Sequence, residues 1–234
     1  MLKFSLKTRL FFLLMALWLF SSIMPLVAQT DPDPNRFLKE IDSFRQWDAK
    51  NAIPERPVLF IGSSSIRKWK THNSFPDLPV VNRGFGGAHI SDMLYFIQDI
   101  ALKYKTPSCI VFYCGDNDIA GGKSPQRVLS DYQKFVRVVH AKFPHVPFIY
   151  IPIKPSLNRW TLWGQMKKAN ELIRAYSDKN KLLFYADTAT PMIDNDGTPH
   201  KDLFVADGLH LNAKGYELWT GVLKEKIEQA RNTK

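Results

Sequence analysis

The fold of this chain is decided by the stretch Val58-Leu59-Phe60-Ile61-Gly62-Ser63-Ser64-Ser65. Four consecutive apolar residues that end at a glycine are typical of a strand buried on both faces. Strands of that kind occur in parallel sheets that helices cover on both sides. The serines that come next lie at the turn into a short helical stretch. This stretch therefore predicts an α/β fold with small polar side chains where a central strand ends.

Outward from this stretch, strand-like and helix-like segments alternate. Apolar runs predict further strands at 80–82, 109–114, 148–153 and 182–185. Helical spacing of apolar residues predicts helices at 35–49, 91–102, 128–139, 166–176 and 216–227, and Ser124-Pro125 is typical of a helix start. The alternation predicts one domain with a five-stranded parallel sheet, whose strands end at one edge, where ligands bind.

The first 29 residues predict a secretory signal peptide ahead of a domain at 30–234. Lys3, Lys7 and Arg9 precede an apolar run from Leu10 to Phe20, and small residues come next near Ala28. The alternative is an uncleaved membrane anchor, since the apolar stretch is close to spanning length. We expect an exported protein, periplasmic or secreted, that meets a membrane only if this segment stays uncleaved.

Charge and cysteine content limit the partners and the covalent links that we expect. The formal net charge of +10 includes three cations of the N-terminal segment, and the basic residues are scattered in short groups. No nucleic-acid motif accompanies them, so we expect no nucleic-acid partner. Cys109 and Cys114 lie on one predicted strand, with Cα atoms roughly 16 Å apart. That separation is too long for a disulfide, so we expect two buried free thiols.

Four polar clusters lie at predicted loops, three of them directly after strands. They are Gly62-Ser63-Ser64-Ser65, Asn82-Arg83-Gly84-Phe85-Gly86-Gly87, Gly115-Asp116-Asn117-Asp118 and Asp207-Gly208-Leu209-His210. Each alone has an ordinary structural explanation as a loop, a turn or a surface pair. The glycine cluster also lacks the spacing of a dinucleotide site. Their joint occurrence, in this order, points to one catalytic site.

Together the clusters resemble the four sequence blocks of the SGNH, or GDSL-type, hydrolases. The likeness runs from Val58 to about Tyr216. It implies a flavodoxin-like three-layer sandwich around a five-stranded parallel sheet. It also implies that Ser64 is the nucleophile, that His210 is the base and that Asp207 orients His210.

The same resemblance implies an oxyanion hole. Its donors would be the backbone N–H groups of Ser64 and Gly84 and the side-chain amide of Asn117. One position departs from the family pattern, because Ser63 stands where the family usually has an aspartate. The tandem serines also leave Ser65 as an alternative nucleophile.

General chemistry agrees with these roles. A serine hydroxyl attacks only when a neighbouring base takes its proton, and an imidazole titrates near neutral pH. A carboxylate fixes the tautomer of that imidazole, and each oxyanion donor lowers the barrier by about 3 kcal/mol. No cofactor and no metal is required.

Arg159, Trp160 and Trp163 come after the fourth predicted strand, on the same edge of the sheet. We expect them to line a substrate pocket for an acyl group or a sugar. The alternative is that the tryptophans pack beneath a loop, because aromatic side chains are common in both settings.

The predicted function is a carboxylic ester hydrolase that removes a short acyl group from a sugar or small alcohol. A lysophospholipase or thioesterase acting on a lipid-type substrate is the nearest alternative. A metal-dependent phosphoesterase would use Asp116, Asp118, Asp207 and His210 as ligands, although such sites usually carry more ligands at tight spacing. A non-catalytic binding protein that keeps the fold is the third.

Overall fold

The computed structural model describes residues 30–233, and its centre is a parallel sheet of five strands. These are β1 (Val58–Gly62), β2 (Val80–Gly84), β3 (Cys109–Tyr113), β4 (Phe148–Tyr150) and β5 (Leu183–Tyr185). They pair in the order β2-β1-β3-β4-β5. The predicted fold class is confirmed. Because β1 and β3 are neighbours, the turns that carry Ser64 and Asn117 leave the sheet side by side.

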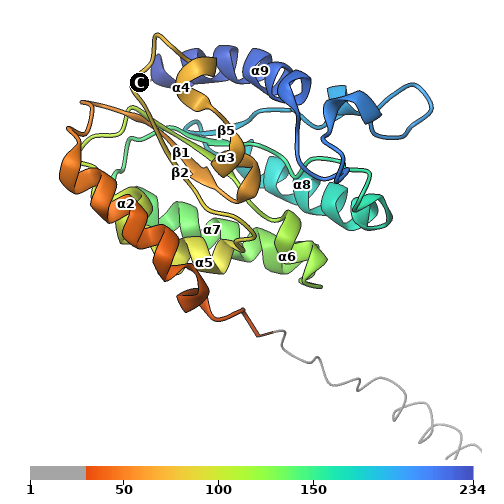
Figure 1. Ribbon diagram of the computed structural model, residues 1–234, viewed down its shortest axis with the longest axis horizontal. Helices are drawn as coiled ribbons and strands as arrows, with labels where there is room; N and C mark the ends of the chain where they lie inside the picture. Colours follow the sequence, from red (N-terminus) through yellow and green to blue (C-terminus); the bar gives the residue numbers. More distant parts are fainter. Residues whose placement is uncertain (1–29, 234) are drawn as a thin grey trace, which may run out of the picture. The chain divides into compact units, whose positions relative to one another are not determined.

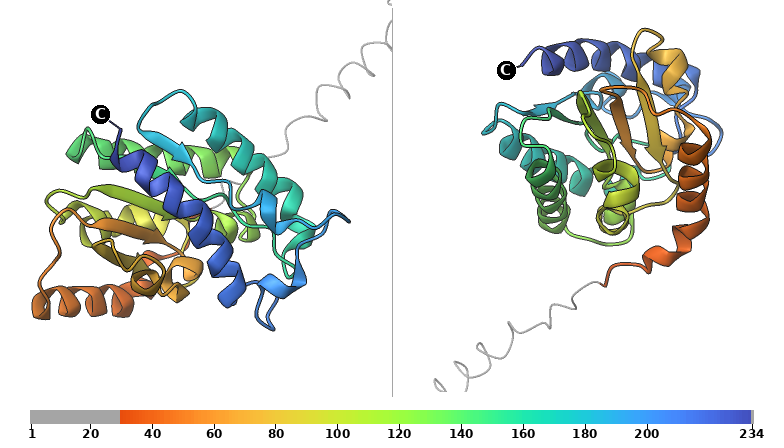
Figure 2. Two further views of the ribbon diagram at one scale, coloured as in Figure 1. Left: turned by 90° about the horizontal axis from the view of Figure 1, so that it is seen from above. Right: turned by 90° about the vertical axis from the view of Figure 1, so that its left-hand side faces the viewer.

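Helices cover both faces of this sheet (Figures 1 and 2). One face carries α2 (Leu38–Lys50), α5 (Ile90–Tyr95), α7 (Pro125–Lys142) and α8 (Trp163–Ser177), and the other carries α3 (Ser64–Lys68), α4 (Thr71–Ser74) and α9 (Ala213–Arg231). The shorter elements are η1 (Pro34–Phe37), η2 (Gln98–Leu102), α6 (Asp116–Ala120), η3 (Trp160–Leu162), η4 (Thr190–Met192) and η5 (Lys201–Leu203). Strand side chains alternate between two buried apolar clusters, one on each face.

Most predicted elements are present, and two differ. The Ser124 side chain caps α7 as predicted, since its Oγ accepts from the Arg127 N–H at 3.2 Å. The helix predicted at 91–102 is instead two pieces, α5 and the π-helical η2. The strand predicted at 148–153 pairs only over β4, because Pro152 has no N–H to donate to a ladder.

The chain beyond Pro152 is held by a side chain in place of a strand. Asn170 of α8 accepts from the Ile153 N–H and donates to the Ile153 carbonyl, both at 2.8 Å. Its side chain thus satisfies both backbone groups that the ladder no longer reaches. The segment that carries Lys154 and Arg159 is therefore fixed by α8.

Both cysteines are buried free thiols, as predicted. Cys109 packs in the cluster beneath α9 and Cys114 packs in the cluster on the opposite face. Burial raises the pKa of both thiols, which disfavours the reactive thiolate. The predicted signal peptide lies outside the described residues, and no helix within residues 30–233 is long and apolar enough to cross a bilayer.

Candidate active site

Ser64 is the first residue of α3, in the turn directly after β1. This turn is tight, because a Cβ on Gly62 would lie 2.1 Å from the Tyr113 carbonyl oxygen of the neighbouring strand. The Ser64 Oγ lies 2.9 Å from His210 Nε2. Ser65, the alternative nucleophile, is fully buried. The geometry therefore favours Ser64 for contact with the base.

His210 and Asp207 are held by a short loop before α9. His210 Nδ1 lies 2.6 Å from one Asp207 oxygen, and the other Asp207 oxygen accepts from the N–H groups of Leu209 and His210 at 2.8 Å each. Burial works in the opposite direction, but these hydrogen bonds keep the pKa of Asp207 well below its usual value. The carboxylate is thus ionised at neutral pH and its partner nitrogen is Nδ1, which leaves Nε2 facing Ser64.

The structure contradicts the prediction that Gly84 supplies an oxyanion donor. Its N–H donates to Asn82 Oδ1 at 2.9 Å. Gly84 serves packing instead, because a Cβ there would lie 2.3 Å from the backbone nitrogen of Arg67 in α3. Sequence reasoning could not separate this role from that of a donor, since both require a glycine in the same cluster.

Other backbone N–H groups of the first two clusters are unused. The N–H groups of Ser64, Gly86 and Gly87 have no hydrogen-bond partner among the described residues. Gly87 has a φ of +77°, which a glycine adopts without strain, and no atom lies within 4 Å of where its Cβ would be. The chain next to it is fixed, because the Ala88 carbonyl accepts from Asn117. Gly86 and Gly87 are therefore the glycines of this cluster that are free to donate, and Gly87 is the one next to the contact between Ala88 and Asn117.

Asn117 lies in α6, directly after β3. Its Nδ2 donates to the Ala88 carbonyl at 3.0 Å, and its Oδ1 accepts from Arg159 Nη2 at 3.0 Å. Its backbone N–H donates to Asp116 Oδ1 at 2.9 Å. The two side-chain contacts orient the amide, and one Nδ2 hydrogen remains available for a ligand.

A buried group of charges lies behind Asn117. Asp116 Oδ2 is 3.3 Å from Arg159 Nη1 and 3.5 Å from Lys154 Nζ, which also contacts the Tyr113 hydroxyl at 3.1 Å. Burial alone would raise the pKa of Asp116, but the charges of Lys154 and Arg159 outweigh it and lower the pKa. Sequence reasoning missed Lys154, because a lone lysine after a strand carries no pattern.

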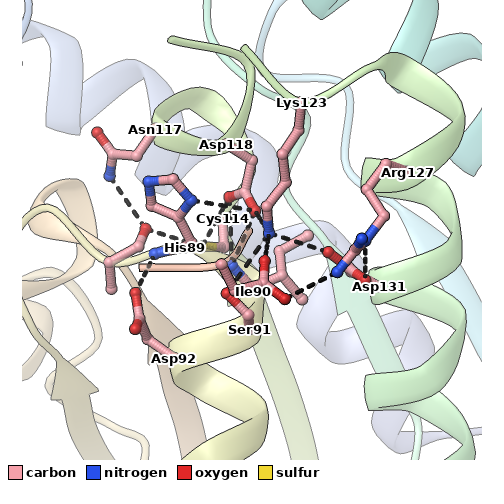
Figure 3. A network of polar contacts seen from close by, with 12 residues as sticks. His89, Ile90, Ser91, Asp92, Cys114, Asn117, Asp118, Lys123, Arg127 and Asp131 are labelled. Atoms are coloured by element: carbon pink, nitrogen blue, oxygen red, sulfur yellow. Dashed lines mark hydrogen bonds and ion pairs between the residues drawn. The ribbon is translucent and has the colours of Figure 1, made fainter. Parts of the chain in front are cut away.

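A second buried network supports the loop between β2 and α5 (Figure 3). Lys123 is almost fully buried and lies 2.9 Å from Asp118 and 3.0 Å from Asp131. Asp118 accepts from the Ile90 N–H at 3.2 Å, so it fixes the chain two residues beyond Ala88. Asp31 joins the network through Lys123 and Arg127, at 2.6 Å and 2.8 Å.

His89 also belongs to this network, as Figure 3 shows. Its Nδ1 lies 3.8 Å from Asp118, and burial lowers the pKa of its ring. Its packed position gives it a structural role. The network as a whole was not predicted, because its members come from segments far apart in the chain.

The segment after β4 lies beside the base. The Asn158 N–H donates to the Gly208 carbonyl at 3.0 Å, which ties this segment to the loop of Asp207 and His210. Trp160 and Trp163 come next, with ring centroids 6.0 Å apart and planes inclined by 16°. Both rings are partly exposed. They form a stacked pair that directly follows Arg159 in the chain, and Trp163 also packs against the core beneath α8.

The four residues considered as metal ligands do not come together. Asp116 pairs with Lys154 and Arg159, Asp118 pairs with Lys123, and Asp207 binds His210. Within residues 30–233, no group of three or more His, Cys, Asp or Glu side chains could hold a metal ion. Asp116 and Asp118 are therefore structural ion-pair partners.

A three-layer α/β fold with these groups at the strand ends defines a hydrolase of the GDSL type. The chain belongs to the GDSL-like lipase/acylhydrolase family, whose model matches residues 65–218. The matched region begins one residue after Ser64 and contains Asn117, Asp207 and His210. No curated protein is similar enough to the chain to count as a relative.

Solved structures share the fold. A GDSL-like lipase from Bacteroides thetaiotaomicron superposes with a TM-score of 0.68 at 22% identity, covering 85% of this chain and 98% of that one. A member of the lipolytic G-D-S-L family from Veillonella parvula gives 0.62 at 20% identity, covering 72% and 96%. A carbohydrate esterase of family 3 from Talaromyces cellulolyticus gives 0.58 at 19% identity, covering 75% and 97%.

Proposed function

We propose that this protein is a serine esterase that hydrolyses carboxylic esters with Ser64, His210 and Asp207. One observation carries the proposal. The Ser64 Oγ, the His210 ring and the Asp207 carboxylate form a continuous chain of contacts, 2.9 Å and 2.6 Å long. In this order of groups, an imidazole takes the proton of a serine and a carboxylate stabilises the imidazolium.

The reaction begins when His210 Nε2 takes the Ser64 hydroxyl proton and Oγ attacks the ester carbonyl carbon. The oxyanion that forms would accept from the Ser64 N–H, the Gly87 N–H and the free Nδ2 hydrogen of Asn117. His210 then returns the proton to the departing alcohol, which leaves an acyl group on Ser64. Water, deprotonated by the same imidazole, releases the acid and restores the serine.

For the substrate, we propose a short acyl group on a sugar or small alcohol. The stacked Trp160 and Trp163 offer aromatic surface of the kind that packs on sugar rings. Among the structures with this fold are the family 3 carbohydrate esterase and an acetyl esterase crystallised with acetate. Replacing Trp160 by Ala should raise KM for acetylated sugars and leave p-nitrophenyl acetate nearly unchanged. An unchanged KM for both would contradict the sugar surface.

The decisive experiment compares wild type with Ser64→Ala and the matched variant Ser65→Ala on p-nitrophenyl acetate and octanoate. Ser64→Ala should lose about 10⁴-fold or more in kcat, as loss of a triad serine does. Ser65→Ala should keep most of the activity. The reverse pattern would make Ser65 the nucleophile. A preference for octanoate would favour the lipid-type substrate, and no turnover of any ester would favour a binding protein.

We further propose that residues 1–29 direct export and are then removed. The cationic start and apolar run support this proposal. Expression of the full chain in a Gram-negative host, with fractionation and N-terminal sequencing of the product, tests it. A periplasmic product that starts near residue 30 is expected. Full-length protein in the membrane fraction would show an anchor instead.

A further inference from the structure

The oxyanion hole of the proposed esterase needs an amide that points in one direction. The Nδ2 end of Asn117 can donate to an oxyanion, whereas its Oδ1 end would repel one. The two ends have nearly the same shape, so packing alone does not distinguish them. Only hydrogen-bond partners of a fixed type can select the productive orientation.

Arg159 is such a partner. Its Nη2 donates to Asn117 Oδ1 at 3.0 Å. A guanidinium has five N–H donors and no acceptor, so it pairs with the oxygen of the amide and rejects the nitrogen. On the opposite side, the Ala88 carbonyl accepts from Nδ2 and rejects the oxygen. These two contacts together specify which way the amide lies.

Arg159 is itself held in place from two directions. Its Nη1 pairs with Asp116 Oδ2 at 3.3 Å, and the other Asp116 oxygen accepts the Asn117 N–H. Its chain segment is tied to the loop of the base by the hydrogen bond between Asn158 and Gly208. Only 18% of its side chain is exposed. A guanidinium held by these contacts has little freedom to move towards a substrate.

The charge of Arg159 has the sign that stabilises an oxyanion. Lys154 and Arg159 share the single carboxylate of Asp116, and all three lie directly behind Asn117. Burial lowers the pKa of Lys154, so the permanent cation of this group is the guanidinium of Arg159. A cation on Oδ1 also polarises the amide, which strengthens the Nδ2–H donor.

We infer that Arg159 is a positioning residue that fixes and polarises the Asn117 amide as an oxyanion donor, rather than a residue that binds substrate. This inference rests on the proposed function and revises the substrate-binding role expected from the sequence. Arg159 acts through Asn117, so its loss should slow the chemical step and leave substrate affinity nearly unchanged.

The test is a double-mutant cycle on p-nitrophenyl acetate and octanoate. Arg159→Met should lower kcat by about 10- to 100-fold, because a small misplacement of a catalytic group has effects of that size. KM should change less than about threefold, and the loss should be equal for both esters. Arg159→Lys, which keeps a donor-only cation near Asp116, should recover part of the rate. Arg137→Met, on the exposed face of α7, is the matched control and should match wild type.

The cycle closes with Asn117→Ala and the double variant Asn117→Ala/Arg159→Met. The double variant should be no slower than Asn117→Ala alone, because Arg159 has nothing left to position. Independent, multiplying losses would overturn the inference, as would a raised KM with unchanged kcat or no effect of Arg159→Met. Thermal unfolding identifies folded variants, and Arg159→Lys serves if Arg159→Met does not fold. If Ser64→Ala were as active as wild type, the proposed function itself would fail, and the role of Arg159 with it.

Discussion

The two halves of the candidate site are built in opposite ways. The acid–base half, Asp207 to His210, is one short loop in which the Asp207 carboxylate makes its hydrogen bonds within four residues. The Asp207 side chain is 46% exposed. The oxyanion half joins the chain near Ala88 to Asn117 and Arg159 from separate elements, and its Asp116 side chain is only 4% exposed.

Because of this difference, mutations in the two halves should affect activity and stability to different extents. A change in the exposed loop removes a reacting group and disturbs little packing. A change among the buried ion pairs leaves a charge without its partner, which costs folding free energy as well as alignment. Variants in the first half should therefore be folded but inactive, and variants in the second should lose stability.

The sharpest test of the exposed half is His210→Ala. Without the base, kcat/KM should fall by about 10⁴-fold or more. The melting temperature should stay within about 2 °C, as expected for a partly exposed side chain in a domain of this size. Kinetics and calorimetry on one sample measure both values. A large drop in melting temperature would mean that the two halves are not separate.

For the buried half, Lys123→Met should lower the free energy of unfolding by about 3–5 kcal/mol, because Asp118 loses its buried cation. The exposed Lys134→Met is the control. Denaturant titration at several pH values gives the comparison.

The pH dependence of this loss has a definite sign. Burial already raises the pKa of Asp118 above its unfolded value, and removal of Lys123 raises it further. A carboxyl with a higher pKa in the folded state stabilises the fold at low pH and loses this effect as pH rises through that pKa. The deficit of Lys123→Met relative to wild type should therefore shrink from pH 8 towards pH 5. A pH-independent deficit would argue against an uncompensated Asp118.

Gly84→Ala tests the packing role assigned to this glycine. A Cβ that would approach the Arg67 nitrogen to 2.3 Å forces α3 to move, at a cost of about 1–3 kcal/mol. Because α3 carries Ser64, kcat should fall as well. Gly221→Ala, in α9 with open space around it, should instead stabilise the protein by about 0.5–1 kcal/mol. Equal effects of the two changes would contradict the close packing of Gly84.

The smallest effect is expected at Ser63, where the family usually has an aspartate. Its side chain is fully buried and its Oγ has no hydrogen-bond partner among the residues that the structure describes. Ser63→Ala should therefore change the free energy of unfolding by less than about 1 kcal/mol and leave kcat close to wild type. A loss above about 2 kcal/mol would reveal a bonded hydroxyl.

The same division separates the features that the sequence predicts from those that it does not. The parallel sheet and the contacts of Ser64, Asp207 and His210 are predictable from apolar runs and local motifs. Assigning the backbone donor failed at Gly84, because adjacent glycines differ only in which N–H group the fold leaves free. The ion pairs of Lys123 and Lys154 could not be predicted, because ion pairs between distant segments leave no periodic signal in the sequence.

The single side chain of Asn170 has a consequence for how this family member can vary. The paired part of β4 ends near Pro152, and Asn170 holds the chain at Ile153, so the register of β4 against β3 does not depend on the loop that follows. Insertions or deletions between Arg159 and the start of α8 would leave the sheet and the contacts of Asn158 and Arg159 in place. They would reshape only the rim that carries the tryptophans, and substrate range could diverge there without a redesign of the scaffold.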